Sequence, residues 1–140
     1  MVAIAAVTVL LAGTGAVSGT GQGKRPPTAT LATFAGRWTG HTRVLKVHRD
    51  GRATESIYSG CCSPQLNLTL LLSHPRGTPA DASVHARVTG VWIRDKAAFT
   101  RQHPGPQVGD IGTLRLRRAV IYDPFTHTDY CSSGGTRSGA

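Results

Sequence analysis

The chain has few acidic residues, few aromatic residues and only three cysteines. Asp and Glu number 7 against 16 Lys and Arg, so few carboxylates are available for acid–base chemistry. Aromatic residues make up 6% of the chain, and none interleave the arginines as they tend to in proteins that bind single-stranded nucleic acid. We therefore expect no nucleic-acid partner.

Recognisable catalytic and metal-binding motifs are also missing. The sequence contains no G-x-S-x-G, no C-x-x-C and no H-x-x-x-H, and structural zinc sites usually show such paired spacing. His127, Asp129 and Cys131 could join Cys61 and Cys62 around a metal, but surface histidines and a disulfide are the interpretation we favour. The sequence thus predicts neither an enzyme nor a metalloprotein, and no cofactor.

The longest apolar run, Val2–Ala12, is too short for a membrane span, which needs about 20 residues. Its length and terminal position are typical of a signal peptide, and Ala16–Ser18 resembles a cleavage site. We predict a signal peptide over 1–18, a secreted protein and no stable membrane span; a buried N-terminal helix or strand is the alternative. No Lys or Arg precedes the run, which leaves open a start upstream of Met1.

Composition and the positions of glycine and proline divide the rest of the chain into segments. A Gly-, Thr- and Pro-rich stretch over 19–33 predicts a flexible linker. Residues 34–131 form one domain by length, and 132–140 read as a disordered tail. The 17 glycines and 8 prolines favour turns over long helices.

Short segments rich in Val, Thr and Leu predict strands within that domain. These segments are 37–48, 53–60, 66–73, 83–93, 112–117 and 120–122. Asp50-Gly51 signals a hairpin, 74–81 a Pro/Gly loop, and Arg118 the centre of another turn. Asp95 could cap one short helix as far as Phe99. The prediction is an all-β antiparallel meander that closes into a small barrel or sandwich, because closure hides the edge strands.

Alternation within the predicted strands assigns faces. The expected core positions are Leu66, Leu68, Leu70, Leu72, Val84, Ala86, Val88, Trp92, Leu114 and Leu116. The opposite face carries His85, Arg87, Thr89, Arg115 and Arg117. Glu55 and Asp50 lie in or next to one hairpin, and we expect both carboxylates to offset nearby arginines.

The net charge of +9 points to an anionic partner. Arg87, Arg115 and Arg117, together with Arg43, could form a patch of guanidinium groups, which suit phosphate, sulfate or carboxylate. Ordinary solvated strand charge that discourages edge pairing is the competing interpretation. The leading hypothesis is an exported, non-enzymatic β domain that binds an anionic envelope polymer or an acidic protein.

The G-x-W of Gly36–Trp38 resembles the opening strand of lipocalin-like barrels, in which the tryptophan plugs one end. That resemblance implies a small barrel holding an apolar ligand, an alternative also suggested by the inward leucines. A tryptophan that packs a core edge is the interpretation of the motif that we favour.

A broader resemblance covers Trp38 to Cys131. The pattern W-x-G-H-T-R…D-G…G-C-C…G-T-L-R-L…Y-C resembles a family of small exported actinomycete proteins. The resemblance implies export and a disulfide-bearing β domain, and it carries no activity over. Such proteins end in a further cysteine, whereas this tail reads YCSSGGTRSGA.

Three cysteines cannot all pair within one molecule. Direct pairing of the adjacent Cys61 and Cys62 requires a strained ring, so we predict that Cys131 pairs with Cys61 or Cys62. Such a bond would close a loop of about 71 residues and stabilise the domain by about 4 kcal/mol. The remaining cysteine is then either buried or free to form an intermolecular disulfide.

Overall fold

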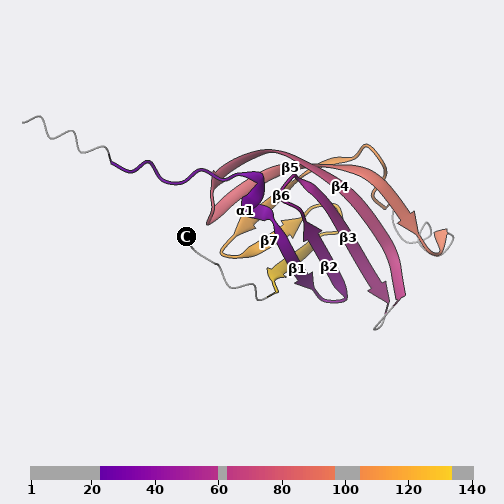
Figure 1. The fold of residues 1–140 in the computed structure, drawn as a ribbon. Coiled ribbons are helices and arrows are strands. Elements are labelled where there is room, and N and C mark those ends of the chain that lie inside the picture. The colour runs from indigo at the N-terminus through magenta and orange to yellow at the C-terminus, as the bar shows by residue number, and fades with distance from the viewer. Residues whose placement is uncertain (1–22, 60–62, 97–104, 134–140) are drawn as a thin grey trace, which may run out of the picture.

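The computed structural model describes residues 23–59, 63–96 and 105–133, and strands dominate these ranges. The elements are α1 (Leu31–Phe34), β1 (Gly36–Gly40), β2 (Arg43–Val47), β3 (Arg52–Ser59), β4 (Ser63–Thr78), β5 (Asp81–Ile93), β6 (Ile111–Arg117), β7 (Val120–Asp123) and β8 (Thr128–Ser132). Each strand pairs antiparallel with the next, and β8 pairs with β1 (Figure 1). The predicted all-β fold is confirmed, in its barrel form.

Apolar positions of the strands fill the barrel interior, as the alternation predicts. In β4, Leu66, Leu68, Leu70 and Leu72 are all buried, while Leu71 between them is 46% exposed. The inward positions of β5 and β6 are filled by Val84, Ala86, Val88, Leu114 and Leu116. The polar residues between them, including His85, Arg87, Arg115 and Arg117, are exposed. These inward side chains form one continuous apolar core.

Trp92 is the exception among the expected core residues, since it is 49% exposed. Thr69 pairs with Gly90 and Leu70 pairs with Val88, so Thr89 is an extra residue in β5. This bulge shifts the alternation by one residue. Val91 and Ile93 therefore pack against the core, and Trp92 turns outward.

The strand boundaries also differ from the prediction. The segment 37–48 is two strands, β1 and β2, because the chain turns at His41 and Thr42, where Thr42 has a φ of 56°. The expected loop over 74–81 belongs mostly to β4, whose pairing with β5 is interrupted between Ser73 and Arg76 and then resumes to Thr78. A strand irregularity thus accommodates Pro75 within β4.

The predicted hairpin at Asp50-Gly51 is confirmed. Gly51 has a φ of +88°, and a Cβ there would lie 2.7 Å from the carbonyl oxygen of Leu72. The turn at Arg118 is confirmed as well, with φ values of 48° at Arg118 and 64° at Ala119. Positive φ values at both residues of a two-residue loop are those of the type I′ turn, which connects the two strands of a hairpin.

The helix α1 closes one end of the barrel. Phe34 is fully buried, and the indole Nε1–H of Trp38 donates to the Phe34 carbonyl at 2.9 Å. Ala29 is buried too, and its amide donates to the Gly77 carbonyl at 2.9 Å. Residues from Ala29 onward, in the segment expected to be linker, therefore pack on the barrel.

Other predictions fall partly or wholly outside the described residues. The signal peptide over 1–18 lies outside them, as does most of the expected helix at 95–99. Of the expected tail, Ser132 belongs to β8, and the amide of Ser133 donates to the Arg37 carbonyl at 3.2 Å. No helix within the described ranges has the length and apolar character that a membrane crossing requires.

Candidate functional site

Polar side chains occupy the barrel interior at the end opposite α1. Alternation in β3 turns Ala53 and Glu55 inward, and the short strands β7 and β8 turn Asp123 and Tyr130 inward. Glu55 and Tyr130 are fully buried, and Asp123 is 1% exposed. Thr126, from the turn between β7 and β8, joins them. We call Glu55, Asp123, Thr126 and Tyr130 the carboxyl cluster.

Hydrogen bonds tie the carboxyl cluster together. The Tyr130 hydroxyl donates to Glu55 Oε1. The Thr126 hydroxyl lies 2.8 Å from Glu55 Oε1 and 2.7 Å from Asp123 Oδ2, although it has only one hydrogen to donate. Glu55 Oε2 is buried without a hydrogen-bond partner among the described residues. Two buried carboxyl groups thus share too few donors to be satisfied if both are ionised.

The burial and contacts of the carboxyl cluster shift the pKa values of Glu55 and Tyr130. Burial and then the neighbouring Asp123 raise the pKa of Glu55 to about 8, against the opposing hydrogen bonds from Tyr130 and Thr126. Burial and then Glu55 raise the pKa of Tyr130 well above its usual range, so its hydroxyl keeps the proton that it donates. At neutral pH, Glu55 is therefore mostly a neutral carboxylic acid beside Asp123.

The expectation for Glu55 was wrong. Glu55 has no ion pair with an arginine in the described part of the chain and occupies a core position instead. Asp50 behaves as expected, since it pairs with Arg52 at 2.7 Å, and this contact lowers the pKa of Asp50. The signal for Glu55 is present in the sequence, because positions 53, 55 and 57 share one face of a strand that reads Ala, Glu, Ile.

Three arginines surround an open depression of about 630 Å³ on the outer face of β4, β5 and β6. Arg76 and Arg115 flank Ser83 in one row of the sheet, and Arg117 follows two residues along β6. We call this feature the arginine depression. Its one carboxylate, Asp81, lies 3.6 Å from Arg117, and both side chains are 72% exposed. Within the described ranges, Arg76 and Arg115 have no ion-pair partner.

Two of the four predicted binding residues thus line this depression, and two do not. Arg87 is exposed on the same outer face but sits opposite Ile111, four residues from the row of Ser83. Arg43 points into the barrel end, where its Nη1 donates to Thr128 Oγ1 at 2.5 Å and to the Thr126 carbonyl at 3.2 Å. Arg76 was not among the predicted binding residues, because its segment was predicted to be a loop.

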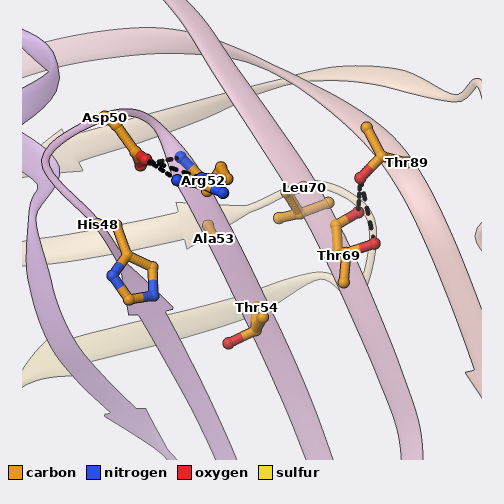
Figure 2. Close-up of a pocket in the computed structure, with 8 residues that line it drawn as sticks. All are labelled: His48, Asp50, Arg52, Ala53, Thr54, Thr69, Leu70 and Thr89. Atoms are coloured by element: carbon orange, nitrogen blue, oxygen red, sulfur yellow. Dashed lines mark hydrogen bonds and ion pairs between the residues drawn. The ribbon is translucent and has the colours of Figure 1, made fainter.

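A second open depression, of about 440 Å³, lies over β3, β4 and β5. Figure 2 shows His48, Asp50 and Arg52 on one side of it and Thr69 and Thr89 on the other. The Thr89 hydroxyl lies 3.1 Å from Thr69 Oγ1, and the bulge in β5 makes this pairing possible. Its two opposite charges, Asp50 and Arg52, bond each other, so this surface offers mainly hydroxyl groups.

The cysteine prediction stays a prediction. Cys131 is exposed on the outer face of β8, and its thiol has no disulfide partner among the residues the structure describes. Cys61 and Cys62 lie outside those residues. Where the chain is described, His, Cys, Asp and Glu side chains do not gather in groups of three or more that could hold a metal ion.

Comparisons with family models, with curated proteins and with solved structures found no match to the chain.

Proposed function

We propose that the protein binds an anionic partner through the arginine depression. The proposal rests on the observation that Arg76, Arg115 and Arg117 line one concave surface with a single neighbouring carboxylate. The net charge of +9 adds long-range attraction for anions.

The sheet geometry sets the spacing of the three guanidinium groups. Neighbouring strands lie about 4.8 Å apart, so Arg76 and Arg115 start roughly 10 Å apart across Ser83. Arg115 and Arg117 start roughly 7 Å apart along β6. Side chains of this length can converge on one phosphate, sulfate or carboxylate group, or hold adjacent groups of a polymer.

The ion pair between Asp81 and Arg117 does not close the depression. Both side chains are largely exposed, and ion pairs in such settings contribute about 0–1 kcal/mol. A ligand anion could therefore replace Asp81 at little cost.

We propose further that the protein acts after export, in the envelope or outside it. The apolar run over residues 2–12 supports this assignment, and an envelope polymer or an acidic protein is then the partner we expect. We assign no enzymatic activity, because the sequence lacks a catalytic motif and the carboxyl cluster is too buried to meet a substrate in this conformation.

A lipocalin-like barrel with an apolar ligand is the second candidate. The closed eight-stranded barrel and the position of Trp38 against α1 favour it. The interior counts against it, since one continuous apolar core and the carboxyl cluster occupy it. Saturable quenching of tryptophan fluorescence by a fatty acid would support this candidate over the anionic one.

Charge-matched variants test the anionic proposal. Arg76, Arg115 and Arg117 are replaced by glutamine in one variant, and the exposed Arg37, Lys46 and Arg49 in the control. On a sulfated-polysaccharide resin, the first variant should elute at clearly lower salt than the control. Equal loss in both variants would mean that only net charge matters, and would contradict a site at the arginine depression.

A further inference from the structure

The turn between β7 and β8, residues 124–127, crosses the end of the barrel opposite α1. Its Thr126 hydroxyl reaches Glu55 of β3 at 2.8 Å, and its Thr126 carbonyl accepts from Arg43 of β2 at 3.2 Å. In the sheet order β1 separates β8 from β2, and β1 and β2 separate β8 from β3, so these are not contacts of neighbouring strands. The side chain of Phe125 packs against the core beneath. The turn therefore lies over the barrel end as a lid.

The lid belongs to the least extensively paired part of the barrel. β7 has four residues and β8 has five. β8 pairs with β1 at Trp38–Ser132 and Thr39–Cys131, and the Ser133 amide adds one hydrogen bond to Arg37, whereas β4 and β5 pair over most of their length. Local opening draws on such weakly tied segments, so the lid can move while the rest of the barrel stays folded.

The groups that face Glu55 come from every element packed around it. Asp123 of β7 is the second carboxyl group, and Tyr130 of β8 and Thr126 of the lid supply hydroxyl groups. Leu68 of β4 and Leu45 of β2 are its sheet neighbours and carry no charge.

Arg43 of β2 is an arginine whose side chain contacts the lid. Its guanidinium bonds Thr126 and Thr128 rather than either carboxylate. No arginine or lysine therefore forms an ion pair with Glu55 or Asp123 in the described ranges.

One hydroxyl hydrogen cannot serve both carboxyl groups. Thr126 lies within hydrogen-bond distance of Glu55 Oε1 and Asp123 Oδ2 together, and both side chains are almost completely buried. A proton on one carboxyl group supplies the missing donor and removes the repulsion between two buried negative charges. Without that proton, the contacts that hold the lid become unfavourable.

We propose that the lid is a proton-controlled closure, held shut by the protonated pair of Glu55 and Asp123 and released when the pair loses its proton. Release moves Thr126 and Phe125 away from the barrel end and lets water reach the two carboxylates. Burial and Asp123 raise the pKa of Glu55 to about 8, so the closure weakens as the pH rises toward 8 and is weakest above it.

Amide hydrogen exchange between pH 6 and pH 9.5 tests this closure in the full chain. The reporter is the Phe125 amide, which donates to Asp123 Oδ1 at 3.0 Å. After correction for base catalysis, its protection should fall about tenfold per pH unit from pH 6 to about pH 8, because opening releases one proton in this range. Above about pH 8 the closed state has lost the same proton, so the protection should level off. The amides of central β4 and β5 residues, such as Leu68 and Val88, should keep their protection.

Variants separate the closure from general alkaline loosening. Glu55→Gln keeps the shape without a titrating proton, so protection of the Phe125 amide should no longer depend on pH. Asp123→Asn keeps a side-chain oxygen that can accept from the Phe125 amide and removes the neighbouring charge. The loss of protection should therefore level off at a lower pH than in the wild type. Asp129→Asn changes an exposed carboxylate of the same hairpin and should behave as the wild type.

Each contrary result is decisive. Wild-type protection at Phe125 that stays flat from pH 6 to pH 9.5 would overturn the proposal. Unchanged pH dependence in both Glu55→Gln and Asp123→Asn would overturn it as well. Equal loss of protection in β4 and β5 would mean global unfolding rather than movement of the lid.

Discussion

Replacing Glu55 with glutamine should remove a pH dependence from the folding stability. Glu55 is fully buried, and its carboxyl group accepts hydrogen bonds from Tyr130 and Thr126. Glutamine has the same shape, keeps an oxygen to accept those bonds and offers an amide hydrogen to Asp123. The substitution therefore imitates the protonated acid and removes only its titration.

The magnitude follows from the pKa of Glu55, which rises from 4.5 to about 8 on folding. Each pKa unit corresponds to about 1.36 kcal/mol, so the whole shift corresponds to roughly 5 kcal/mol of unfolding free energy. The folded protein keeps a proton that the unfolded chain releases above its ordinary pKa. This stabilisation is therefore fully present below about pH 4.5 and is lost as the pH rises through about 8.

Urea unfolding at unit steps from pH 5 to pH 9 measures the effect, with tryptophan fluorescence as the signal. The wild type should lose up to about 1.4 kcal/mol per pH unit between pH 5 and pH 8. Opening of the lid at lower free-energy cost would limit the total loss below 5 kcal/mol. The glutamine variant should lack this loss.

Asp50→Asn provides the control, because Asp50 is an exposed carboxylate whose pKa is already lowered by Arg52. It titrates below the measured range, so this variant should keep the wild-type slope. Equal slopes in the wild type and in Glu55→Gln would refute the reasoning, as would a wild-type stability that does not change between pH 5 and pH 8.

Two further substitutions, each compared with a control substitution, test the packing. Leu70→Ala should cost about 2–5 kcal/mol in urea unfolding, whereas Leu71→Ala, one residue along and 46% exposed, should cost less than about 1 kcal/mol; similar costs would contradict the facing of β4. Gly51→Ala should destabilise by about 1–3 kcal/mol, because its Cβ would meet the Leu72 carbonyl at 2.7 Å as well as a φ of +88°. Gly109→Ala shares the positive φ but has open space around it, so it should cost less; equal costs would mean that the contact with Leu72 is unimportant.

Prediction succeeded where short-range periodicity decides the outcome. Leucines at every second position from 66 to 72 indicate one buried strand face, and those four side chains are buried. Asp50-Gly51 signals a hairpin through the conformational freedom of a single glycine, and the hairpin is present. Neither inference requires knowledge of the strand's neighbours.

Prediction failed where a distant segment decides the outcome. The residues of β8, Thr-Asp-Tyr-Cys-Ser, carry little apolar alternation, so only pairing with β7 and β1 makes them a strand. The alternation of β5 predicts that Trp92 faces inward, but the bulge at Thr89 shifts the alternation by one residue and turns Trp92 outward. Arg43 was assigned to the outer face, but its position in β2 places it in the barrel end beside Thr126.

By itself, the sequence determined that this protein is a basic, turn-rich β domain and which residues of most strands face inward. These properties depend on composition and on a two-residue period, both of which are local. Only the tertiary structure decided that Arg76 lies beside Arg115 and that Thr126 reaches Glu55, 71 positions earlier in the chain. Such meetings depend on strand register and on closure of the barrel, which no short stretch of sequence encodes.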